Sequence, residues 1–383
     1  MKHVALVCKL MPLYRLGIFH ELSLIKNPYK FTCFGDTKKE AGIEIIPWSL
    51  ANDLDSGGVN WVKTKNYFYI SEKLLWQTGI IKRIFSSKYE FFIFEGASLH
   101  LPTWLFAVLC RLSGKKVLFW THGFKGFDKG LKKLIRTCYF KLADALLLYG
   151  QYSKDLMLKS GFKENKLFII YNSLDSTKQL EFLKTSNYDI ILKEKNSLFI
   201  RPELLTVIFI GRLVKSKNIP FLLNAVKDFS QVGNPINCII IGNGPEMDGI
   251  KSFTMKNNLQ NYIHITGALH EEALIGKYFM MSDLMVSPGN VGLNCIHSLA
   301  YGVPVLTHNN LQFQGPEVEA IISGVTGLLF EHNNYEDMLV KLRDWQENRL
   351  TKAQISIKCQ KVILNQYNPV KQAEYILNAI ESL

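Results

Sequence analysis

Short apolar runs alternate with amphipathic stretches along almost the whole chain. In the first half, six runs have the length and composition of buried strands, at 3–7, 31–34, 91–94, 117–120, 145–148 and 167–170. Helical patterns separate them, at 73–85, 103–112, 131–142 and 153–160. Strands that alternate with helices predict a parallel, doubly wound sheet.

A polar stretch at 172–202 interrupts this alternation, which then begins again. Strands are predicted at 205–210, 237–241, 262–265, 284–286, 303–307 and 327–330. Helices are predicted at 219–229, 246–256, 271–280 and 292–300, and again to the end of the chain. The predicted fold is α/β, with two Rossmann-like doubly wound domains at 1–172 and 173–368. They are expected to face each other across a cleft, because ligands of such sheets bind at the carboxyl ends of the strands.

Composition places the chain among ordinary globular proteins. Its 383 residues are 48% hydrophobic and 20% charged, and no apolar run reaches the roughly 18–20 residues of a spanning helix. The apolar N-terminal run is better explained as a first strand than as a signal peptide. Seven scattered cysteines without a Cys-x-x-Cys pair indicate free thiols in a reducing compartment. We therefore expect a cytoplasmic protein.

The charge is concentrated in the first half. Residues 1–172 contain 26 Lys and Arg against 13 Asp and Glu, whereas residues 173–383 contain 19 against 20. This asymmetry indicates an anionic partner for the first half: membrane lipid, a lipid diphosphate or nucleic acid. The segment 124–141 mixes lysines with apolar residues, a pattern typical of helices on an anionic bilayer. A helix with one buried and one solvated face is the alternative.

The most informative segment is a strand that leads into a helix through a glycine-bearing loop, at 284–302. The apolar run ends at Pro288-Gly289, and a helical pattern begins near Gly292 and stops at Gly302. Such a loop leaves backbone N–H groups free at the positive end of a helix, and glycine allows a ligand to approach the backbone. A phosphate suits this position.

Two further strand ends carry glycine. After the run 205–210, Gly211 and Arg212 are followed by Lys217, so that two cations stand in one short loop and can neutralise a diphosphate. A solvated basic loop is the alternative. After the run 237–241, Gly242 and Gly244 form a Gly-x-Gly turn. It lacks the third glycine of a dinucleotide fingerprint, so a tight turn beside a ligand is preferred to NAD binding.

Other candidate groups are isolated. His122 follows the run 117–120, where it can hydrogen-bond a sugar or help to hold an acceptor, although a single histidine is more often structural. Asp53 and Asp55 match the Asp-x-Asp pattern of some metal sites, but polar residues surround them and a surface loop is preferred. We predict no metal and no cofactor. A phosphate-binding Gly-x4-Gly-Lys loop and a Gly-x-Ser-x-Gly elbow are absent from the sequence.

Taken in order, these segments resemble the retaining GT-B glycosyltransferases of the large "group 1" family, over nearly the whole chain. The resemblance includes the opening 11–15 loop, the Thr-His-Gly at 121–123 and the Gly-Arg-Leu at 211–213. It continues through the Gly-x-Gly-Pro at 242–245, the segment 286–304, and the Gly-Pro-Glu at 315–317. The resemblance also implies that a C-terminal helix, at about 369–383, packs back on the first domain.

The resemblance assigns roles to particular residues. It implies that Arg212 and Lys217 hold the diphosphate of a nucleotide-sugar donor, and that His122 lines the donor-sugar and acceptor side. The positions that it assigns to the donor are Gly211, Gly242, Gly244, Gly289, Asn290, Gly292, Leu293 and His297. Tyr14 and Arg15 are assigned to the acceptor side.

The sequence departs from the family at two positions. In the family, one glutamate contacts the donor sugar and a second, eight positions later, binds the ribose; here these positions are Gly289 and His297. A neutral imidazole, favoured near a helix start, can still hydrogen-bond a ribose hydroxyl. We interpret this as a variant site.

The expected function is transfer of a sugar, with retention, from a UDP- or GDP-sugar to a lipid-linked or polysaccharide acceptor, as in lipopolysaccharide synthesis. The expected location is the inner face of the cytoplasmic membrane, on an anionic lipid surface. Two alternatives are a nucleotide-sugar epimerase and a non-catalytic binding subunit. Nucleic-acid binding is not expected, because no recognisable module for it is present.

Overall fold

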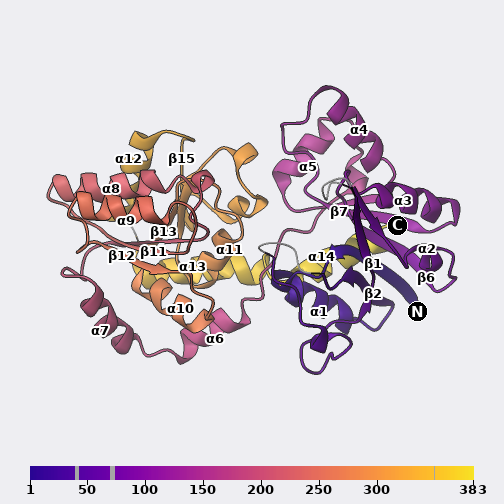
Figure 1. Cartoon of the computed structure of the whole chain (residues 1–383), viewed down its shortest axis with the longest axis horizontal. Coiled ribbons are helices and arrows are strands. Elements are labelled where there is room, and N and C mark those ends of the chain that lie inside the picture. Colours follow the sequence, from indigo (N-terminus) through magenta and orange to yellow (C-terminus); the bar gives the residue numbers. More distant parts are fainter. Residues whose placement is uncertain (39–42, 70–73, 349) are drawn as a thin grey trace. The chain divides into compact units, whose positions relative to one another are not determined.

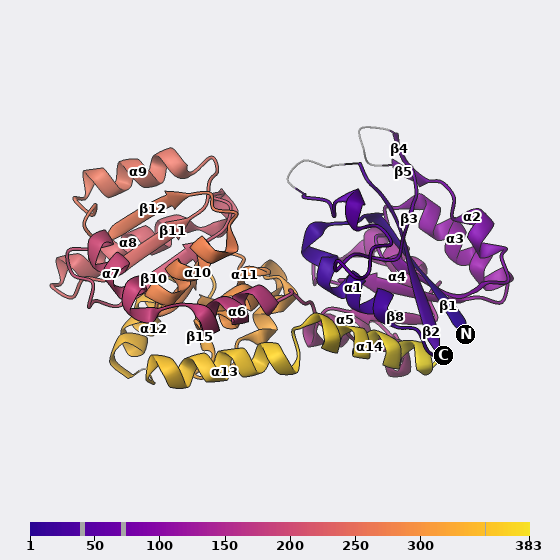
Figure 2. The ribbon, with the colours of Figure 1, turned by 90° about the horizontal axis from the view of Figure 1, so that it is seen from below.

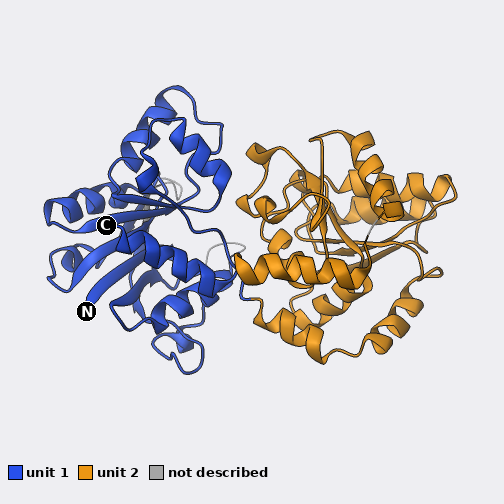
Figure 3. Cartoon of the chain, turned by 180° about the vertical axis from the view of Figure 1, so that it is seen from behind, with its two compact units in different colours: residues 1–175, 368–383 blue, residues 176–367 orange. Residues whose placement is uncertain are grey.

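The computed structural model describes residues 1–38, 43–69, 74–348 and 350–383. The chain forms two compact units (Figure 3). Unit 1 comprises Met1–Asp175 and Asn368–Leu383, and unit 2 comprises Ser176–Tyr367.

Unit 1 is built on a seven-stranded parallel sheet with the order β3-β2-β1-β6-β7-β8-β9 (Figure 1). Its strands are β1 (Lys2–Leu10), β2 (Tyr29–Asp36), β3 (Trp61–Lys63), β6 (Tyr89–Glu95), β7 (Lys116–Thr121), β8 (Ala145–Leu148) and β9 (Leu167–Ile169). The central strands are buried on both faces, which explains why their sequences are apolar runs without alternation.

Helices cover both faces of this sheet. On one face, α1 (Leu16–Leu24) and the C-terminal α14 (Pro369–Glu381) pack side by side (Figure 2). The other face carries α2 (Ile81–Ile84), α3 (Leu101–Leu112), α4 (Gly130–Phe140) and α5 (Gln151–Leu158). Short 3-10 turns lie at Leu13–Arg15, Trp48–Leu50 and Glu164–Lys166.

Unit 2 contains a six-stranded parallel sheet with the order β12-β11-β10-β13-β14-β15. Its strands are β10 (Thr206–Ile210), β11 (Asn237–Ile241), β12 (Ile263–Gly267), β13 (Leu284–Ser287), β14 (Val305–His308) and β15 (Gly327–Phe330). Numbered within the unit, this is the 3-2-1-4-5-6 order of the Rossmann fold.

The helices of unit 2 also lie on both faces of its sheet. One face carries α8 (Ile219–Gln231), α9 (Met247–Lys256) and α12 (Tyr335–Asn348), and the other carries α10 (Glu272–Met281), α11 (Asn294–Ala300) and α13 (Lys352–Asn365) (Figure 1). Further 3-10 turns lie at Lys215–Lys217, Leu311–Phe313 and Pro316–Ala320. All predicted strands of both halves are present, which confirms the alternation inferred from hydrophobicity.

One predicted segment was wrong, and the polar stretch between the two halves, for which no element was predicted, contains two helices. The helix expected at 73–85 is a hairpin strand followed by one helical turn: β4 (Asn66–Tyr69) pairs antiparallel with β5 (Leu74–Gln77), and α2 follows; residue 73 itself lies outside the described residues. The sequences Asn-Tyr-Phe-Tyr and Leu-Leu-Trp-Gln are rich in aromatic residues, which are enriched in strands. The polar stretch 172–202 forms α6 (Thr177–Thr185) and α7 (Tyr188–Leu198), whose apolar residues are too few for hydropathy alone to identify.

The C-terminal helix is tied to unit 1 by a buried polar side chain. Gln372 is 1% exposed; its Oε1 accepts a hydrogen bond from Ser173 Oγ at 2.7 Å, and its Nε2 donates to the Tyr171 carbonyl at 2.5 Å. When a buried polar group loses its hydrogen-bond partner, the folded state is destabilised by the full desolvation free energy of that group.

We therefore expect Gln372→Ala to lower the free energy of unfolding of unit 1 by about 2 kcal/mol. Urea unfolding followed by tryptophan fluorescence measures this change. Lys371→Ala on the same helix is the control, because its ion pair with Glu374 lies at the surface. Equal midpoints for Gln372→Ala and the control would show that this contact does not hold the helix.

Candidate functional site

Each sheet reverses its strand order at one point. In unit 2 the reversal lies between β10 and β13, and in unit 1 it lies between β1 and β6. The loops after these two strands leave in opposite directions, and ligands of doubly wound sheets bind in the crevice that results. In unit 2 the predicted residues at 211–217 and 289–297 follow these two strands, and Gly242 and Gly244 follow the neighbouring β11. In unit 1, Tyr14 and Arg15 follow β1, and His122 follows β7.

In unit 2, three predicted glycines allow two loops to pack together. Gly211, Gly242 and Gly244 have φ of +146°, +151° and +158°. A Cβ atom at Gly242 would overlap the Gly211 carbonyl oxygen, and one at Gly244 would lie 2.9 Å from the Leu213 nitrogen. The structure therefore explains these glycines by the close contact of the β10 and β11 loops.

The loop after β13 contacts the basic loop after β10. The Gly289 N–H donates to the Lys217 carbonyl at 3.0 Å, and a Cβ atom at Gly289 would lie 2.7 Å from Lys217 Cα. The Lys217 ammonium in turn donates to the Asn290 carbonyl. Two segments more than seventy residues apart are thus joined, and the structure brings Lys217 to the loop that contains Gly292.

The helix after this loop begins two residues later than predicted. Gly292 has φ of +57°, Leu293 is the N-cap, and α11 starts at Asn294. The Asn294 side chain donates to the Ile210 carbonyl at 2.6 Å, which anchors the helix start to the end of β10. The sequence pattern placed the start at Gly292 because glycine precedes the apolar period, but its left-handed backbone belongs to the loop.

The two predicted cations differ in environment. Arg212 is exposed, and within the described residues no hydrogen bond or ion pair involves its guanidinium. Lys217 is half-buried, and its burial lowers the pKa of its ammonium, although the carboxylate of Glu317 opposes this shift. Arg212 is thus open to an anionic ligand, whereas Lys217 would have to exchange the Asn290 carbonyl for one.

A third segment supports the loop after β13 and was not predicted to do so. The Val291 N–H donates to Gln314 Oε1 at 2.9 Å, and Gln314 Nε2 donates to Thr307 Oγ1 at 2.8 Å. Glu317 is 4% exposed and its carboxylate lies against Gly315. A Cβ atom added at Gly315 would lie 3.2 Å from Gly292 Cα, so this segment also packs against the glycine loop. The sequence shows Gly-Pro-Glu at this point, yet neither hydropathy nor spacing indicates that its carboxylate approaches a lysine.

His297 is engaged with a carboxylate that sequence reasoning did not identify. Its Nε2 lies 2.7 Å from Glu272 Oε1, which also accepts from Tyr301 Oη at 2.7 Å and from Gln179 Nε2 at 3.0 Å. Burial raises the pKa of Glu272, but these hydrogen bonds and His297 more than offset it, so that the net shift is downward. The expectation for His297 considered only the helix dipole and omitted this partner.

In unit 1 the carboxyl ends of β1, β6, β7 and β8 bring together a second cluster. Arg15 Nη1 lies 3.3 Å from Glu95 Oε1, and Arg15 Nη2 donates to Tyr149 Oη at 2.6 Å. The other carboxylate oxygen of Glu95 accepts from the Lys9 N–H at 2.8 Å. The His122 ring lies over Tyr149, with ring centroids 4.5 Å apart. The structure therefore joins Arg15 and His122, and it adds Glu95 and Tyr149, which were not predicted.

The surroundings of His122 disfavour its charged form. Desolvation of the ring is the largest cause, and Lys125, Arg15 and Arg136 add positive charge, so the pKa of His122 is lowered. The residue nevertheless keeps an exposed edge. A neutral imidazole with an accessible edge can donate and accept hydrogen bonds to sugar hydroxyls. Tyr14 is exposed beside Arg15, with the guanidinium 5.8 Å from its ring centroid.

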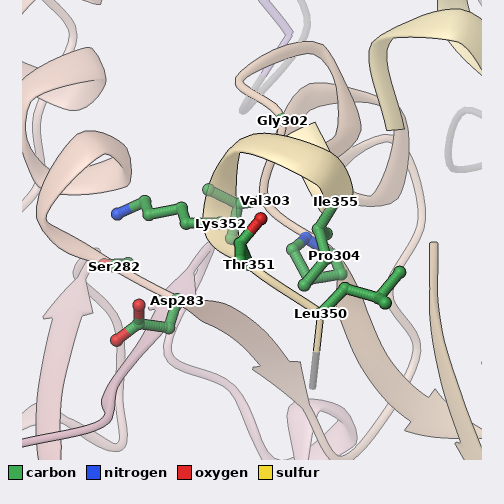
Figure 4. Close-up of a pocket in the computed structure, with 9 residues that line it drawn as sticks. All are labelled: Ser282, Asp283, Gly302, Val303, Pro304, Leu350, Thr351, Lys352 and Ile355. Carbon is green, nitrogen blue, oxygen red and sulfur yellow. The ribbon is translucent and has the colours of Figure 1, made fainter. Parts of the chain in front are cut away.

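A cavity of about 260 Å³ lies elsewhere in unit 2, at the amino ends of β13 and β14 (Figure 4). Asp283 and Lys352 are its charged residues. Asp283 accepts from the Thr206 N–H at 2.9 Å, and Lys352 donates to the Met280 carbonyl at 2.6 Å. These groups hold the fold, and the cavity lies at the end of the sheet opposite the glycine loops.

Other features bear on cofactors and membranes. Asp53 and Asp55 lie in an exposed turn, where Asp53 Oδ1 accepts from the Ser56 N–H at 3.3 Å. Among the described residues, no group of three or more His, Cys, Asp or Glu side chains is arranged to hold a metal ion. No helix in the described parts has the length and hydropathy needed to cross a bilayer. All seven cysteines are free thiols.

One family model and several known sequences match parts of the chain. The model of the family described as glycosyl transferases group 1 matches residues 191–381. An uncharacterized 41.2 kDa protein in the cps region of Klebsiella pneumoniae is 28% identical over 233 residues, which cover 58% of each chain. One subunit of the phosphatidylinositol N-acetylglucosaminyltransferase of Arabidopsis thaliana is 23% identical over 273 residues, 63% of this chain and 58% of that one. The match thus spans little more than half of each relative.

Comparison with solved structures concerns the fold. HepE of Anabaena, solved in complex with UDP, superposes with a TM-score of 0.72 and 15% identity, and the match covers 100% of both chains. Similarity at this identity speaks for the fold alone. It confirms the predicted fold class, an α/β architecture with two Rossmann-like domains of the GT-B type.

The stability of the strand that holds Gln314 beside the loop after β13 should depend on pH, because this strand ends in a buried histidine whose carbonyl accepts from Gln314 Nε2. His308 ends β14, is 1% exposed and lies 4.4 Å from the His332 ring; burial, together with His332, lowers the pKa of His308 to about 4. Between pH 7 and 5 the unfolded chain takes up a proton that folded His308 does not. Stability therefore falls as the pH falls.

When the pH falls from 7 to 5, the free energy of unfolding of the wild type should decrease. In His308→Asn we expect this decrease to be smaller by on the order of 2 kcal/mol. Asn is chosen because its side-chain oxygen can still accept from the Asn310 N–H, as His308 Nδ1 does. Urea unfolding at both pH values measures the difference, with the exposed His270→Asn as control. An unchanged pH dependence in His308→Asn would contradict this assignment.

Proposed function

Because residues 191–381 belong to the group 1 glycosyl transferases, we propose that the chain transfers a sugar from a nucleotide-diphosphate donor, a UDP- or GDP-sugar. The acceptor in this proposal is a lipid-linked glycan or polysaccharide, and transfer proceeds with retention and without a metal. The observation that carries it is the joining of Lys217 to the glycine loop after β13, at the strand-order reversal of unit 2. HepE, which shares the fold, binds UDP.

The donor diphosphate would be held by charge and by backbone amides. The Arg212 guanidinium can approach a phosphate as a planar fork, and the Lys217 ammonium can approach it as a point charge. The amides of Gly292 and Leu293 lie in the same loop, ahead of the first turn of α11. Lys217 would exchange the Asn290 carbonyl for the diphosphate when the donor binds. As the anomeric bond opens, negative charge would accumulate on the leaving diphosphate, and donors already in place around it would stabilise that charge without further reorganisation.

The ribose would be bound by the pair of His297 and Glu272. A vicinal diol is suited to a site with both an imidazole and a carboxylate, because each hydroxyl can donate and accept. Tyr301 and Gln179 fix the carboxylate and so preorganise it. This arrangement supports a working variant site, in spite of the missing glutamate at position 297.

The acceptor would be recognised by the cluster at the carboxyl edge of unit 1. His122 and Tyr14 offer an imidazole and a phenol at the surface, while Arg15 is held in place by Glu95 and Tyr149. We propose that these groups bind sugar hydroxyls of the acceptor, and that the excess of cations in this unit draws it to an anionic membrane surface. The phosphatidylinositol named in one relative is a lipid of that kind.

We expect Arg212→Ala and Lys217→Ala each to lower the turnover number by roughly a hundredfold or more, the scale of losing one charge-stabilising donor. Lys215→Ala in the same loop is the matched control, because Lys215 is exposed and its ammonium forms no hydrogen bond or ion pair with the described residues. Near-normal turnover in both variants would rule out this diphosphate site.

The donor itself is identified by a thermal-shift screen across UDP-, GDP-, ADP- and TDP-sugars. A donor at a hundred times its Kd adds about 2.7 kcal/mol to the stability of the fold, so the rank order of midpoints names the base and the sugar. Absence of any shift would favour a non-catalytic subunit. Formation of an epimer without acceptor would favour the epimerase.

A further inference from the structure

The apolar stripe of α4 faces outward. Leu131, Leu134, Ile135 and Cys138 follow helical spacing and are all exposed, with Leu131 at 71%. Only the last turn of the helix, with Tyr139 and Phe140, is buried. An amphipathic helix normally buries its apolar stripe against the core. Here the apolar stripe is exposed at the surface instead, which is unfavourable in water.

The neighbouring α3 is apolar on both sides. Its inner side is buried in the core of unit 1, and its outer side carries Leu101, Leu105, Val108 and Leu112, all exposed, with Leu112 at 80%. Residues 101–110 contain no charged side chain. A surface helix whose outer stripe is made of leucine and valine is unusual for a protein that remains in water.

The two stripes belong to one face of unit 1. Trp104 of α3 packs against Tyr139 of α4, with ring centroids 5.0 Å apart, and both helices cover the same side of the sheet. The short α2 lies beside α3 (Figures 1 and 2) and adds the exposed Phe85. We call this surface the α3–α4 face. Its exposed apolar residues therefore come from three elements that lie on the same side of the sheet.

Cations accompany this face. Residues 79–142 contain 12 Lys and Arg against 3 Asp and Glu, which is most of the net charge of +12 of the whole chain. Lys125, Lys129, Lys132 and Lys133 are exposed on α4 and the loop before it. Arg136 instead turns inward, to Asp128 and the Gly123 carbonyl. Lys132 lies 3.7 Å from Asp128, and the other three lysines form no ion pair with the described residues, so most of this charge beside the stripe of α4 is unmatched by acids.

We propose that the α3–α4 face docks on an anionic lipid bilayer, with the outer stripe of α3 and the stripe of α4 immersed at the boundary of the acyl chains and the four lysines at the headgroups. Apolar area and positive charge are the two components that hold helices in a membrane interface. The inference deepens the proposed function. It rests on that function in one respect: docking would give the protein access to a lipid-linked acceptor. It extends the surface from α4, where the sequence indicates it, to α3.

Vesicle flotation with the whole chain tests the proposal. Vesicles of phosphatidylcholine alone are compared with vesicles that contain phosphatidylglycerol at one part in three. We expect binding to the anionic vesicles to be at least about tenfold stronger, and to weaken in 0.5 M NaCl, because salt screens charges at the headgroups.

Two sets of variants separate the components. Leu101, Leu105, Val108 and Leu112 changed together to Gln should weaken binding to anionic vesicles at least about tenfold, because the inserted apolar area is lost. Lys125, Lys129, Lys132 and Lys133 changed to Gln should cost roughly fivefold for each lysine and remove the salt dependence.

Matched controls lie in unit 2. Ile200, Val232, Met255 and Ile357 are exposed apolar residues, and Lys251, Lys256, Lys358 and Lys361 are exposed lysines. The same changes there should leave vesicle binding as in the wild type. Thermal shift by UDP checks that every variant is folded, and failure of UDP to shift the wild type would count against the proposed function but not against docking.

Three outcomes would overturn the inference. One is the absence of flotation with either vesicle. Another is flotation that the α3 variant and the unit 2 control weaken equally. The third is a dimer, found by light scattering, that the α3 variant dissociates while vesicle binding stays unchanged, because a second copy would then cover this face.

Discussion

The reversal of strand order in each parallel sheet is the constraint on which the candidate sites depend. Strands on the two sides of the reversal send their connections to opposite faces, so the loops after them diverge and leave backbone and side chains accessible at the carboxyl edge. In unit 2 this edge joins Lys217 to the Asn290 carbonyl, and in unit 1 it joins Arg15 to Glu95. The chemistry of the protein is thus positioned by topology before any side chain is considered.

Each site uses buried contacts to hold a few accessible groups. Gln314 and the buried Glu317 support the glycine loop of unit 2, and Tyr149 and Glu95 fix Arg15 in unit 1. Preorganised donors cost no rearrangement when charge develops on a leaving group, so such supports are as important to the proposed transfer as the groups that would contact the donor. Under the proposed function, Glu272 beside His297 would supply the carboxylate that the resemblance places at position 297.

Hydropathy was sufficient to predict every strand of the two large sheets except the three-residue edge strand β3, because parallel strands buried on both faces are continuous apolar runs. It failed in the polar stretch that contains the two helices within 177–198, and in the short antiparallel strands 66–69 and 74–77, which were included in a predicted helix or not predicted. Glycines and cations in loops marked the edge of each sheet. Contacts between distant segments, such as Glu272 with His297 or Glu95 with Arg15, have no signature in local sequence and needed the fold.

The central claim is that a nucleotide diphosphate occupies the crevice at the carboxyl edge of the unit 2 sheet. A crystal structure of this chain with UDP tests it most directly. We expect the diphosphate within hydrogen-bonding distance of the Lys217 ammonium and the amides of Gly292 and Leu293, with Lys217 released from the Asn290 carbonyl. Density for UDP at the opposite edge of the sheet, in the cavity beside Lys352, with the glycine loop left vacant, would contradict the account.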